Sequence, residues 1–311
     1  MAIALCQVMV RSIQLHWCNL AQKTATFKQV LDLADFIGAQ DVISSGICYD
    51  YTLALLLLDR ASNSLTCMRF SDTLLCEVSL QSVEMRFPRI QVFPDSSILV
   101  TDSRCAPTVD GHTSNAVVFN QYGAILRRFT LGDAIEDVQI SDSGEIWVSY
   151  FDEGIFGDGL GTSGLNCFDA KGKLIWRYQA PVGFDDISDC YAINVAGSFV
   201  YACYYTDFPV VQIAPDKSVT GWANNLTGAR AIAVSDLRVL LFGGYRDNTR
   251  CTVMTLGTHG GMLAPQSYPV ASPEGIEKCK IMGRGACLHA LVGTVWYRLS
   301  IDDFSKSASE I

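Results

Sequence analysis

The sequence has few of the residue patterns that mark familiar catalytic and metal-binding sites. Its four histidines are isolated, and it contains neither an HExxH motif nor a Cys-x-x-Cys pair, so a zinc site has little support. It also lacks the GxSxG elbow of hydrolases and the GxxxxGK[ST] loop that cradles phosphates. None of these kinds of chemistry is therefore predicted.

Long apolar runs are missing as well. The longest, Leu53 to Leu58, is far shorter than the roughly 20 residues that a membrane-spanning helix needs. Residues 1–10 have no basic residue before their apolar stretch, which argues against a secretory signal. We therefore expect a cytoplasmic protein that does not enter a membrane.

Basic residues are scarce relative to acidic ones, with 23 Lys and Arg against 32 Asp and Glu and a net charge of −9. Nucleic acids and anionic membranes are bound through clustered Lys and Arg, so we expect neither as a partner. A basic protein partner or a cation would suit this balance, although solubility alone explains it equally well. The chain is expected to be a monomer.

Cysteine, in contrast, is plentiful, with 12 residues in the chain. Most of them lie within apolar strand patterns, and they are spread along the sequence. Free cysteine behaves as a small buried apolar residue, and disulfide-dense chains are usually much shorter. We therefore predict that these thiols are reduced.

The most informative feature of the sequence is a repeat. Phe119 matches Phe168 and Gly123 matches Gly172, both at an offset of 49 residues. The matching segments are residues 88–100 with 136–148, and residues 117–129 with 165–177. A repeat of this length that is built of strands and turns is typical of one blade of a β-propeller.

The repeat predicts an all-β fold: a single β-propeller domain of six blades, each with four antiparallel strands. The predicted blades are residues 37–80, 82–132, 133–181, 182–228, 229–270 and 271–304. The last unit shows only three strands, and residues 25–33 form a spare strand that would complete it and leave no open sheet edge. Seven blades would require an unrecognised blade in the first 80 residues. Residues 1–20 are strand-like, and residues after Asp303 are expected to fray.

Three segments carry a resemblance to a known family: residues 142–154, 189–195 and 203–209. Here the chain resembles a bacterial group of uncharacterised β-propeller-like proteins, and the likeness covers roughly residues 85–250. The resemblance implies the six-bladed fold and a bacterial source, and it assigns no catalytic residue. The repeat landmarks of WD, kelch and sialidase-type propellers are absent or incomplete.

Charged loops are expected to converge on one face of the propeller. The loop before the innermost strand and the loop between the second and third strands lie on this upper face, over the central channel. The candidate upper-face residues are Glu136, Asp137, Asp189, Tyr205, Asp207, Arg230 and Asp247. The acidic loops also include Arg89 and Lys278 as basic neighbours.

These carboxylates have three interpretations. Oxygen ligands suit Ca²⁺ or Mg²⁺, and the candidate ligands are Asp137, Asp152, Asp189, Asp207 and Asp247. Crowding could instead raise the pKa of one carboxyl and create an acid–base pair. The third and simplest interpretation is that they cap turns. No cofactor is expected otherwise, and no metal ligand is assigned.

The segment 151–164 has five glycines in fourteen residues and is predicted to be a flexible loop with apolar side chains on it. Exposed apolar groups on a long loop suggest contact with a partner. The candidate partner-binding residues are Asp152, Glu153, Ile155, Phe156, Asp158 and Leu160. Alternatively, Ile155 and Phe156 fold back over the blade.

Three functions follow from these features. The first is a non-enzymatic module that binds a protein partner through its upper-face loops, and we favour it because no catalytic set is evident. The second is a metal-dependent hydrolase or lyase of the six-bladed lactonase-like type, which would need at least three carboxylates around one ion. The third is binding of a small ligand such as a sugar against Tyr205 and Trp222.

Overall fold

The computed structural model of the chain describes residues 24–108, 111–258, 260–271 and 273–304. The strand-like residues 1–20 and the C-terminal residues 305–311 lie outside this part. Phe304, the last described residue, is buried, and its ring centroid lies 4.7 Å from that of Tyr268.

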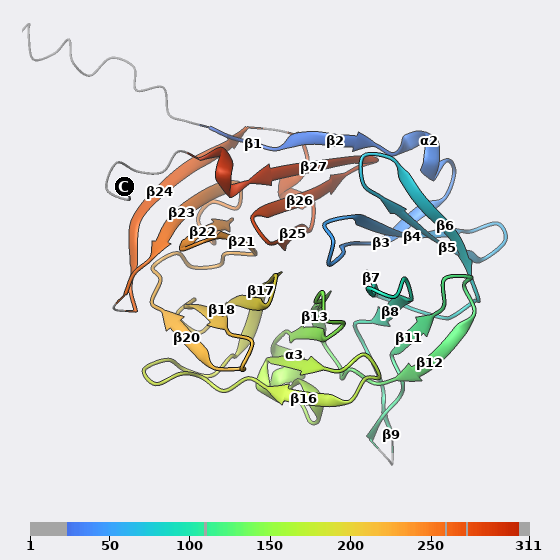
Figure 1. The fold of residues 1–311 in the computed structure, drawn as a ribbon, viewed down its shortest axis with the longest axis horizontal. Helices are drawn as coiled ribbons and strands as arrows, with labels where there is room; N and C mark the ends of the chain where they lie inside the picture. The colour runs from blue at the N-terminus through green and yellow to red at the C-terminus, as the bar shows by residue number, and fades with distance from the viewer. Residues whose placement is uncertain (1–23, 109–110, 259, 272, 305–311) are drawn as a thin grey trace, which may run out of the picture.

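Six sheets surround a central axis, and each contains four antiparallel strands of one blade (Figure 1). The first sheet contains β3 (Asp41–Ile47), β4 (Leu53–Asp59), β5 (Ser64–Phe70) and β6 (Leu74–Leu80). The second contains β7 (Pro88–Val92), β8 (Ile98–Asp102), β11 (Ala116–Phe119) and β12 (Ile125–Phe129). The third contains β13 (Ile135–Ile140), β14 (Ile146–Tyr150), β15 (Leu165–Phe168) and β16 (Leu174–Arg177). The prediction of a six-bladed propeller is confirmed.

The other three sheets follow the same order from the axis outward. The fourth contains β17 (Asp189–Ala196), β18 (Phe199–Tyr205), β19 (Val210–Ile213) and β20 (Val219–Trp222). The fifth contains β21 (Ala231–Ser235), β22 (Arg238–Phe242), β23 (Arg250–Leu256) and β24 (Met262–Ala271). The sixth contains β25 (Ile281–Arg284), β26 (Cys287–Val292), β27 (Val295–Ser300) and the N-terminal β2 (Lys28–Asp32).

The ring closes as predicted, through the N-terminal strand. The blue β2 runs beside the red β27 in Figure 1, and the two pair antiparallel. A feature not foreseen is β1 (Ala25–Thr26), which pairs parallel with β24 of the fifth blade. The N-terminal segment therefore joins the last two blades, and α2 (Ala34–Ile37) leads from it into the first blade.

The sequence repeat corresponds to equivalent backbone positions in the second and third blades. Gly123 and Gly172 both have a φ of 83°, in the turn after the third strand. A Cβ at Gly172 would lie 2.3 Å from the ring of Phe129, and one at Gly123 would lie 1.8 Å from the Ser79 carbonyl oxygen. Both the left-handed backbone and the close approach therefore require glycine.

Apolar side chains fill the spaces between blades. Inner strands such as β14 are buried along their whole length, whereas the outermost β16 alternates between exposed and half-buried residues. This is the pattern expected when a strand is covered on both faces or on one face only. The twist of the sheets lets neighbouring blades pack face to face around the axis.

Short helices and a hairpin occupy the loops of the second and third blades. A two-stranded hairpin of β9 (Pro107–Thr108) and β10 (Gly111–His112) extends from the second blade. The third blade carries α3 (Asp152–Ile155) and the 3₁₀ turn η1 (Leu160–Ser163). Further 3₁₀ turns are η2 (Ile276–Lys278) and η3 (Ile301–Asp303).

The cysteines within the described residues are free thiols. Most are buried in the strands, and burial raises the pKa of Cys203, for example, to about 12. None of the helices in the described ranges is both long enough and apolar enough to cross a bilayer.

Candidate functional site

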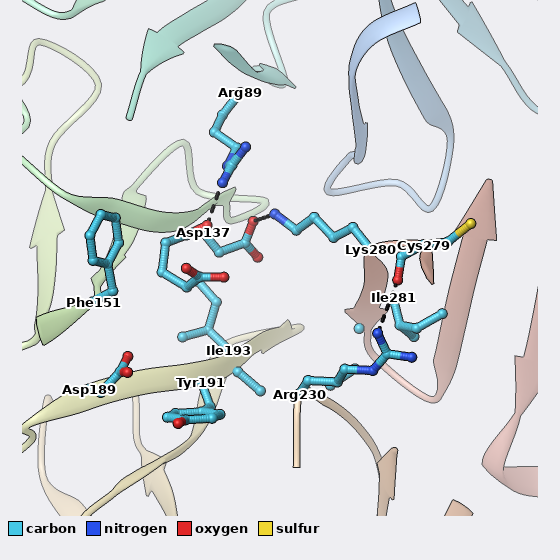
Figure 2. A pocket seen from close by; sticks show the side chains of 14 residues that line it. Arg89, Asp137, Phe151, Asp189, Tyr191, Ile193, Arg230, Cys279, Lys280 and Ile281 are labelled. Atoms are coloured by element: carbon cyan, nitrogen blue, oxygen red, sulfur yellow. Dashed lines mark hydrogen bonds and ion pairs between the residues drawn. The ribbon is translucent and has the colours of Figure 1, made fainter. Parts of the chain in front are cut away.

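A cavity of about 570 Å³ lies where the innermost strands begin, at the upper mouth of the central channel. Six charged side chains line it, three acidic and three basic: Glu136, Asp137, Asp189, Arg89, Arg230 and Lys280. They lie at the starts of β7, β13 and β17 and in the segments just before β21 and β25. Five of the six blades therefore contribute, each at the start of its innermost strand (Figure 2). The structure thus brings together Glu136, Asp137, Asp189 and Arg230 of the predicted upper-face set.

Two of the innermost strands that carry these charged side chains have irregular pairing. In β13 the register shifts between Ile135 and Asp137, and in β17 it shifts between Asp189 and Ala192. An extra residue in a strand locally disrupts the alternation of side chains between the two faces. Consecutive residues, Glu136 and Asp137, therefore both line the cavity.

The other predicted upper-face residues do not line the cavity. Tyr205 is exposed at the end of β18, with its ring centroid 5.8 Å from that of Phe208. Asp207 lies in the following turn and is exposed. Asp247 accepts hydrogen bonds from the Thr249 backbone and hydroxyl and is paired with Arg250 at 3.1 Å.

Two carboxyls of the cavity have no ionic partner. Among the described residues, the side chains of Glu136 and Asp189 form neither an ion pair nor a hydrogen bond, although both are only partly exposed. Burial, with smaller contributions from the charges of Asp152 and Glu136, raises the pKa of Asp189 to about 6. Burial also raises the pKa of Glu136, against the opposing charge of Lys280.

Two guanidinium groups of the cavity also lack a carboxylate partner in the described part of the chain. Arg89 donates through Nε to the backbone oxygen of Glu136 at 3.3 Å. Arg230 donates to three backbone oxygens, those of Glu277, Cys279 and Asn248, at 3.1 to 3.3 Å. Backbone oxygens position these groups but do not neutralise them, so both positive charges remain available to a ligand.

The only ion pair between cavity-lining residues of the described chain joins Lys280 to Asp137, with 2.6 Å from Nζ to Oδ1. Asp137 also accepts a hydrogen bond from Gln139 at 3.2 Å. Four of the six charged side chains are therefore unpaired, which is unusual for partly buried charges outside functional sites.

Sequence reasoning did not assign several lining residues to the site. Phe151 and Tyr191 provide aromatic rings beside Asp189, and Cys279 and Lys280 lie at the opposite end (Figure 2). The Tyr191 hydroxyl lies 2.7 Å from that of Tyr245. Lys280 has no sequence signal, because its place depends on how the last blade meets the third.

The candidate metal ligands are dispersed. Asp137 is paired with Lys280 and Asp247 with Arg250, while Asp152 and Asp189 are close enough to influence each other electrostatically. Within the described ranges, no group of three or more His, Cys, Asp or Glu side chains is arranged to hold a metal ion. The carboxylate cluster that the lactonase-like hypothesis requires is not present in that part of the chain.

The glycine-rich segment 151–164 is ordered into α3 and η1 rather than forming an open loop. Ile155 is buried, with 8% of its surface exposed, and it packs into the core between the third and fourth blades. Phe156, in contrast, is 76% exposed. Asp152 and Asp158 are exposed, whereas Leu160 is half-buried against the core.

The glycines of this segment serve close packing. A Cβ at Gly161 would lie 2.6 Å from the Gly154 backbone oxygen, and a Cβ at Gly154 would lie 2.6 Å from that of Asp133. The backbone therefore folds tightly onto itself and onto the preceding loop. This physical role of glycine replaces the flexibility that the composition had suggested.

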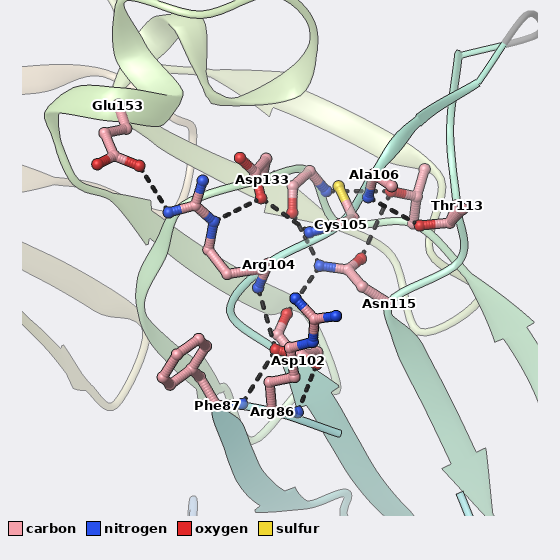
Figure 3. A network of polar contacts seen from close by, with 12 residues as sticks. Arg86, Phe87, Asp102, Arg104, Cys105, Ala106, Thr113, Asn115, Asp133 and Glu153 are labelled. Atoms are coloured by element: carbon pink, nitrogen blue, oxygen red, sulfur yellow. Dashed lines mark hydrogen bonds and ion pairs between the residues drawn. The ribbon is translucent and has the colours of Figure 1, made fainter. Parts of the chain in front are cut away.

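Polar contacts anchor the segment to the second blade (Figure 3). Arg104 donates to Glu153 at 2.6 Å and to Asp133 at 3.1 Å, so it joins α3 to the loop before β13. The same Asp133 oxygen accepts from the Cys105 backbone at 2.8 Å. Asn115 donates to the Asp102 and Gly132 backbone oxygens, both at 2.8 Å, beneath this network. Glu153 thus has a structural partner, which leaves Phe156 as the exposed apolar group.

Comparison with known proteins supports the fold and gives a family match for part of the chain. A family model described as the YxzG family matches residues 165–245, from β15 to just beyond β22. No curated protein matches the sequence at a significant level.

Solved propeller structures resemble the chain over most of its length. A streptogramin B lyase structure has a TM-score of 0.50 at 11% identity and covers 82% of this chain and 92% of its own. Hsv2 from Kluyveromyces lactis has a TM-score of 0.52 at 10% identity and covers 81% and 71%. Identities this low show a shared fold. The chain is a six-bladed β-propeller with partial similarity to a small uncharacterised family.

Proposed function

We propose that the cavity at the upper mouth of the channel binds a small polar organic molecule. The observation that carries this proposal is that four of its six charged side chains, Arg89, Glu136, Asp189 and Arg230, form no ion pair among the described residues. Partly buried charges are costly unless something compensates them. A ligand with complementary groups would do so.

The size and lining of the cavity agree with this function. About 570 Å³ lies within the roughly 300–1,000 Å³ range of small-molecule sites. The rings of Phe151 and Tyr191 supply apolar contact area, while the charged groups supply orientation. This interpretation develops the small-ligand alternative, but it moves the site from Tyr205 and Trp222 to the channel mouth.

Cys279 provides a test that reports from the edge of the cavity, where its thiol donates to the Gly275 backbone oxygen. The protein is screened with charged and neutral polar fragments, and alkylation of Cys279 by iodoacetamide is followed by peptide mass spectrometry. Cys76, exposed on the outermost strand of the first blade, serves as the internal control. We expect at least one fragment to slow alkylation of Cys279 and not of Cys76. If no fragment slows the alkylation of Cys279, the result would count against the proposal.

We also infer a second function, contact with a basic protein partner across the upper face. The specific observation is that Phe156 is 76% exposed while the acidic Asp152 and Asp158 flank it. An exposed aromatic side chain among polar neighbours is typical of an interface anchor. Because Ile155 is buried, this interface depends on Phe156 rather than on both apolar side chains.

A matched pair of positions tests this second function. A photoreactive phenylalanine analogue replaces Phe156 in one variant and Tyr122 in another, since Tyr122 is 79% exposed in the turn on the opposite face. We expect a basic protein to be cross-linked from position 156 only. After purification, this partner should bind the Phe156→Ser variant more weakly than the unaltered protein. Equal cross-linking from both positions would contradict a specific interface.

A further inference from the structure

The charges of the cavity are separated in space, with one end acidic and aromatic and the other basic. Asp189, Phe151 and Tyr191 lie together at one end, whereas Arg230 lies at the other, and the Lys280 side chain reaches from that end across to Asp137 (Figure 2). Asp189 is influenced by the negative charges of Asp152 and Glu136, and no cation of the described chain counteracts its charge. This end of the cavity therefore has an uncompensated negative potential beside two aromatic rings.

The basic end has the opposite imbalance. Arg230 is held by backbone oxygens and by the Phe242 ring, whose centroid lies 4.9 Å from the guanidinium carbon, and the Cys279 oxygen that it bonds at 3.3 Å brings it next to the Lys280 backbone. Lys280 is neutralised by Asp137, but Arg230 keeps its full charge. Arg89, on the wall between the two ends, is likewise bonded only to a backbone oxygen.

We propose that the ligand of this cavity is a dipolar molecule, with a cationic amine bound at Asp189 between Phe151 and Tyr191 and an anionic group bound at Arg230. The three acidic and three basic lining side chains balance, so a ligand without net charge leaves the site neutral. A carboxylate and an aromatic face are both favourable neighbours of an amine. An arginine is the usual partner of a carboxylate or phosphate.

The geometry disfavours the simpler ligand classes. A purely anionic ligand would satisfy Arg230 but would add to the repulsion around Asp189, Asp152 and Glu136. A purely cationic ligand would leave both guanidinium groups uncompensated. A neutral sugar would satisfy hydrogen bonds, but it would leave the four unpaired charges partly buried without compensation.

This inference rests on the proposed function, so its test separates the two. The probes are the straight-chain ω-amino acids from glycine to 8-aminooctanoate, each compared with the carboxylic acid and the amine of the same length. Affinity is measured by isothermal titration calorimetry, and location by protection of Cys279 from alkylation. We expect one amino acid of the series to bind at least about tenfold more tightly than its matched acid and amine.

Substitutions assign the two ends. Asp189→Asn should weaken the best amino acid about tenfold but should not weaken the matched carboxylic acid, because the amine contact is lost while repulsion of the carboxylate is reduced. Arg230→Gln should weaken the amino acid and the acid but not the amine. The control is Asp186→Asn, which makes the same change at an exposed position three residues before Asp189. It should bind every probe as the unaltered protein does.

Three results would overturn the inference. If a matched acid or amine protects Cys279 and binds as tightly as the amino acid, dipolar recognition is wrong, although the cavity still binds small molecules. If only neutral fragments protect Cys279, dipolar recognition is again wrong, while binding of small molecules in the cavity stands. If no probe or fragment of any class protects Cys279, then the proposed function and the dipolar ligand both fail.

Discussion

The mouth of the central channel and its floor use the same kinds of residue in opposite ways. At the mouth, the side chains of Glu136, Asp189, Arg89 and Arg230 form no ion pair within the described chain. On the floor, the buried side chains of Asn194, Gln139 and Arg284 are hydrogen-bonded to backbone groups of neighbouring blades. The contrast separates polar residues that stabilise the propeller from those that are available to a ligand.

The floor is closed by three buried side chains. Asn194, with 0% of its surface exposed, donates to the Ile232 and Gly285 backbone oxygens and accepts from the Gly285 backbone at 2.7 to 2.9 Å. Gln139 bonds the Ile193 and Gly283 oxygens at 3.1 Å, and Arg284 bonds the Ile140 oxygen at 2.7 Å. These bonds join the third, fourth, fifth and sixth blades across the axis.

The largest expected effect is at the floor. Asn194→Ala should lower the free energy of unfolding by about 3 kcal/mol, because it removes three buried hydrogen bonds and leaves their backbone partners unsatisfied. Chemical denaturation measures this change. Asn248→Ala, in an exposed loop, is the control and should change little. A loss below about 1 kcal/mol would mean that the floor and the mouth do not differ as described.

At the mouth, in contrast, removing a charge should increase the free energy of unfolding. The fold raises the pKa of Asp189 to about 6, so it favours the protonated carboxyl and loses stability as the pH rises through that value. Asp189→Asn should therefore raise the free energy of unfolding at pH 7.5 by about 1 kcal/mol, a value reduced for solvent screening.

The pH dependence is the diagnostic part of this prediction. The gain from Asp189→Asn should shrink as the pH falls below 6 and should vanish near pH 4, where the folded carboxyl is already protonated. The charges facing Asp189 are those of Asp152 on α3 and Glu136 on β13, and both are acidic. A variant that is less stable than the unaltered protein at pH 7.5 would contradict this account.

A smaller effect is expected for the one ion pair of the cavity. Lys280→Met should lower the free energy of unfolding by about 0.5 kcal/mol at low salt, since both partners are partly exposed. High salt should reduce the difference, because screening already weakens the pair. A salt-independent loss of about 2 kcal/mol or more would show that Lys280 stabilises the fold by packing instead.

The smallest effect on stability is expected at the rim. Phe156→Ser should change the free energy of unfolding by less than about 0.5 kcal/mol, because its side chain is 76% exposed. Its neighbour Ile155 is buried, and Ile155→Ser should cost about 2 kcal/mol or more. Similar losses for the two variants would mean that Phe156 packs against the blade in solution.

The fold was predictable because the same pattern of strands and turns recurs in successive blades. The pairs Phe119 and Phe168, and Gly123 and Gly172, revealed the repeat, and the glycines share one φ because the same turn recurs. The spare strand at residues 25–33 indicated how the ring closes. The parallel pairing of β1 with β24 could not be predicted, since two residues carry no periodic signal.

The site was only partly predictable, because the contacts of loop side chains differ from blade to blade and do not follow from the sequence repeat. Glu136, Asp137, Asp189 and Arg230 were placed at the mouth by topology, and all four line the cavity. Asp247 turned back onto Thr249 and Arg250, which is a common local use of Asp.

The segment 151–164 illustrates the limit of composition. Its glycines suggested flexibility, yet Gly154 and Gly161 allow two backbone segments to approach closely. Composition alone does not distinguish these roles. Only the packed structure shows that Phe151 faces the cavity, Ile155 the core and Phe156 the solvent.

The most direct test of the account is the titration of the Asp189 carboxyl, followed by ¹³C NMR in the unaltered protein and assigned with Asp189→Asn. We expect a pKa of about 6, because the carboxyl is partly buried beside Asp152 and Glu136 without a cation. Addition of the tightest ω-amino acid should lower this pKa, since the bound amine would stabilise the ionised form. An ordinary aspartate pKa near 4, unchanged by every probe, would contradict the claim that the mouth holds an unpaired, ligand-ready charge.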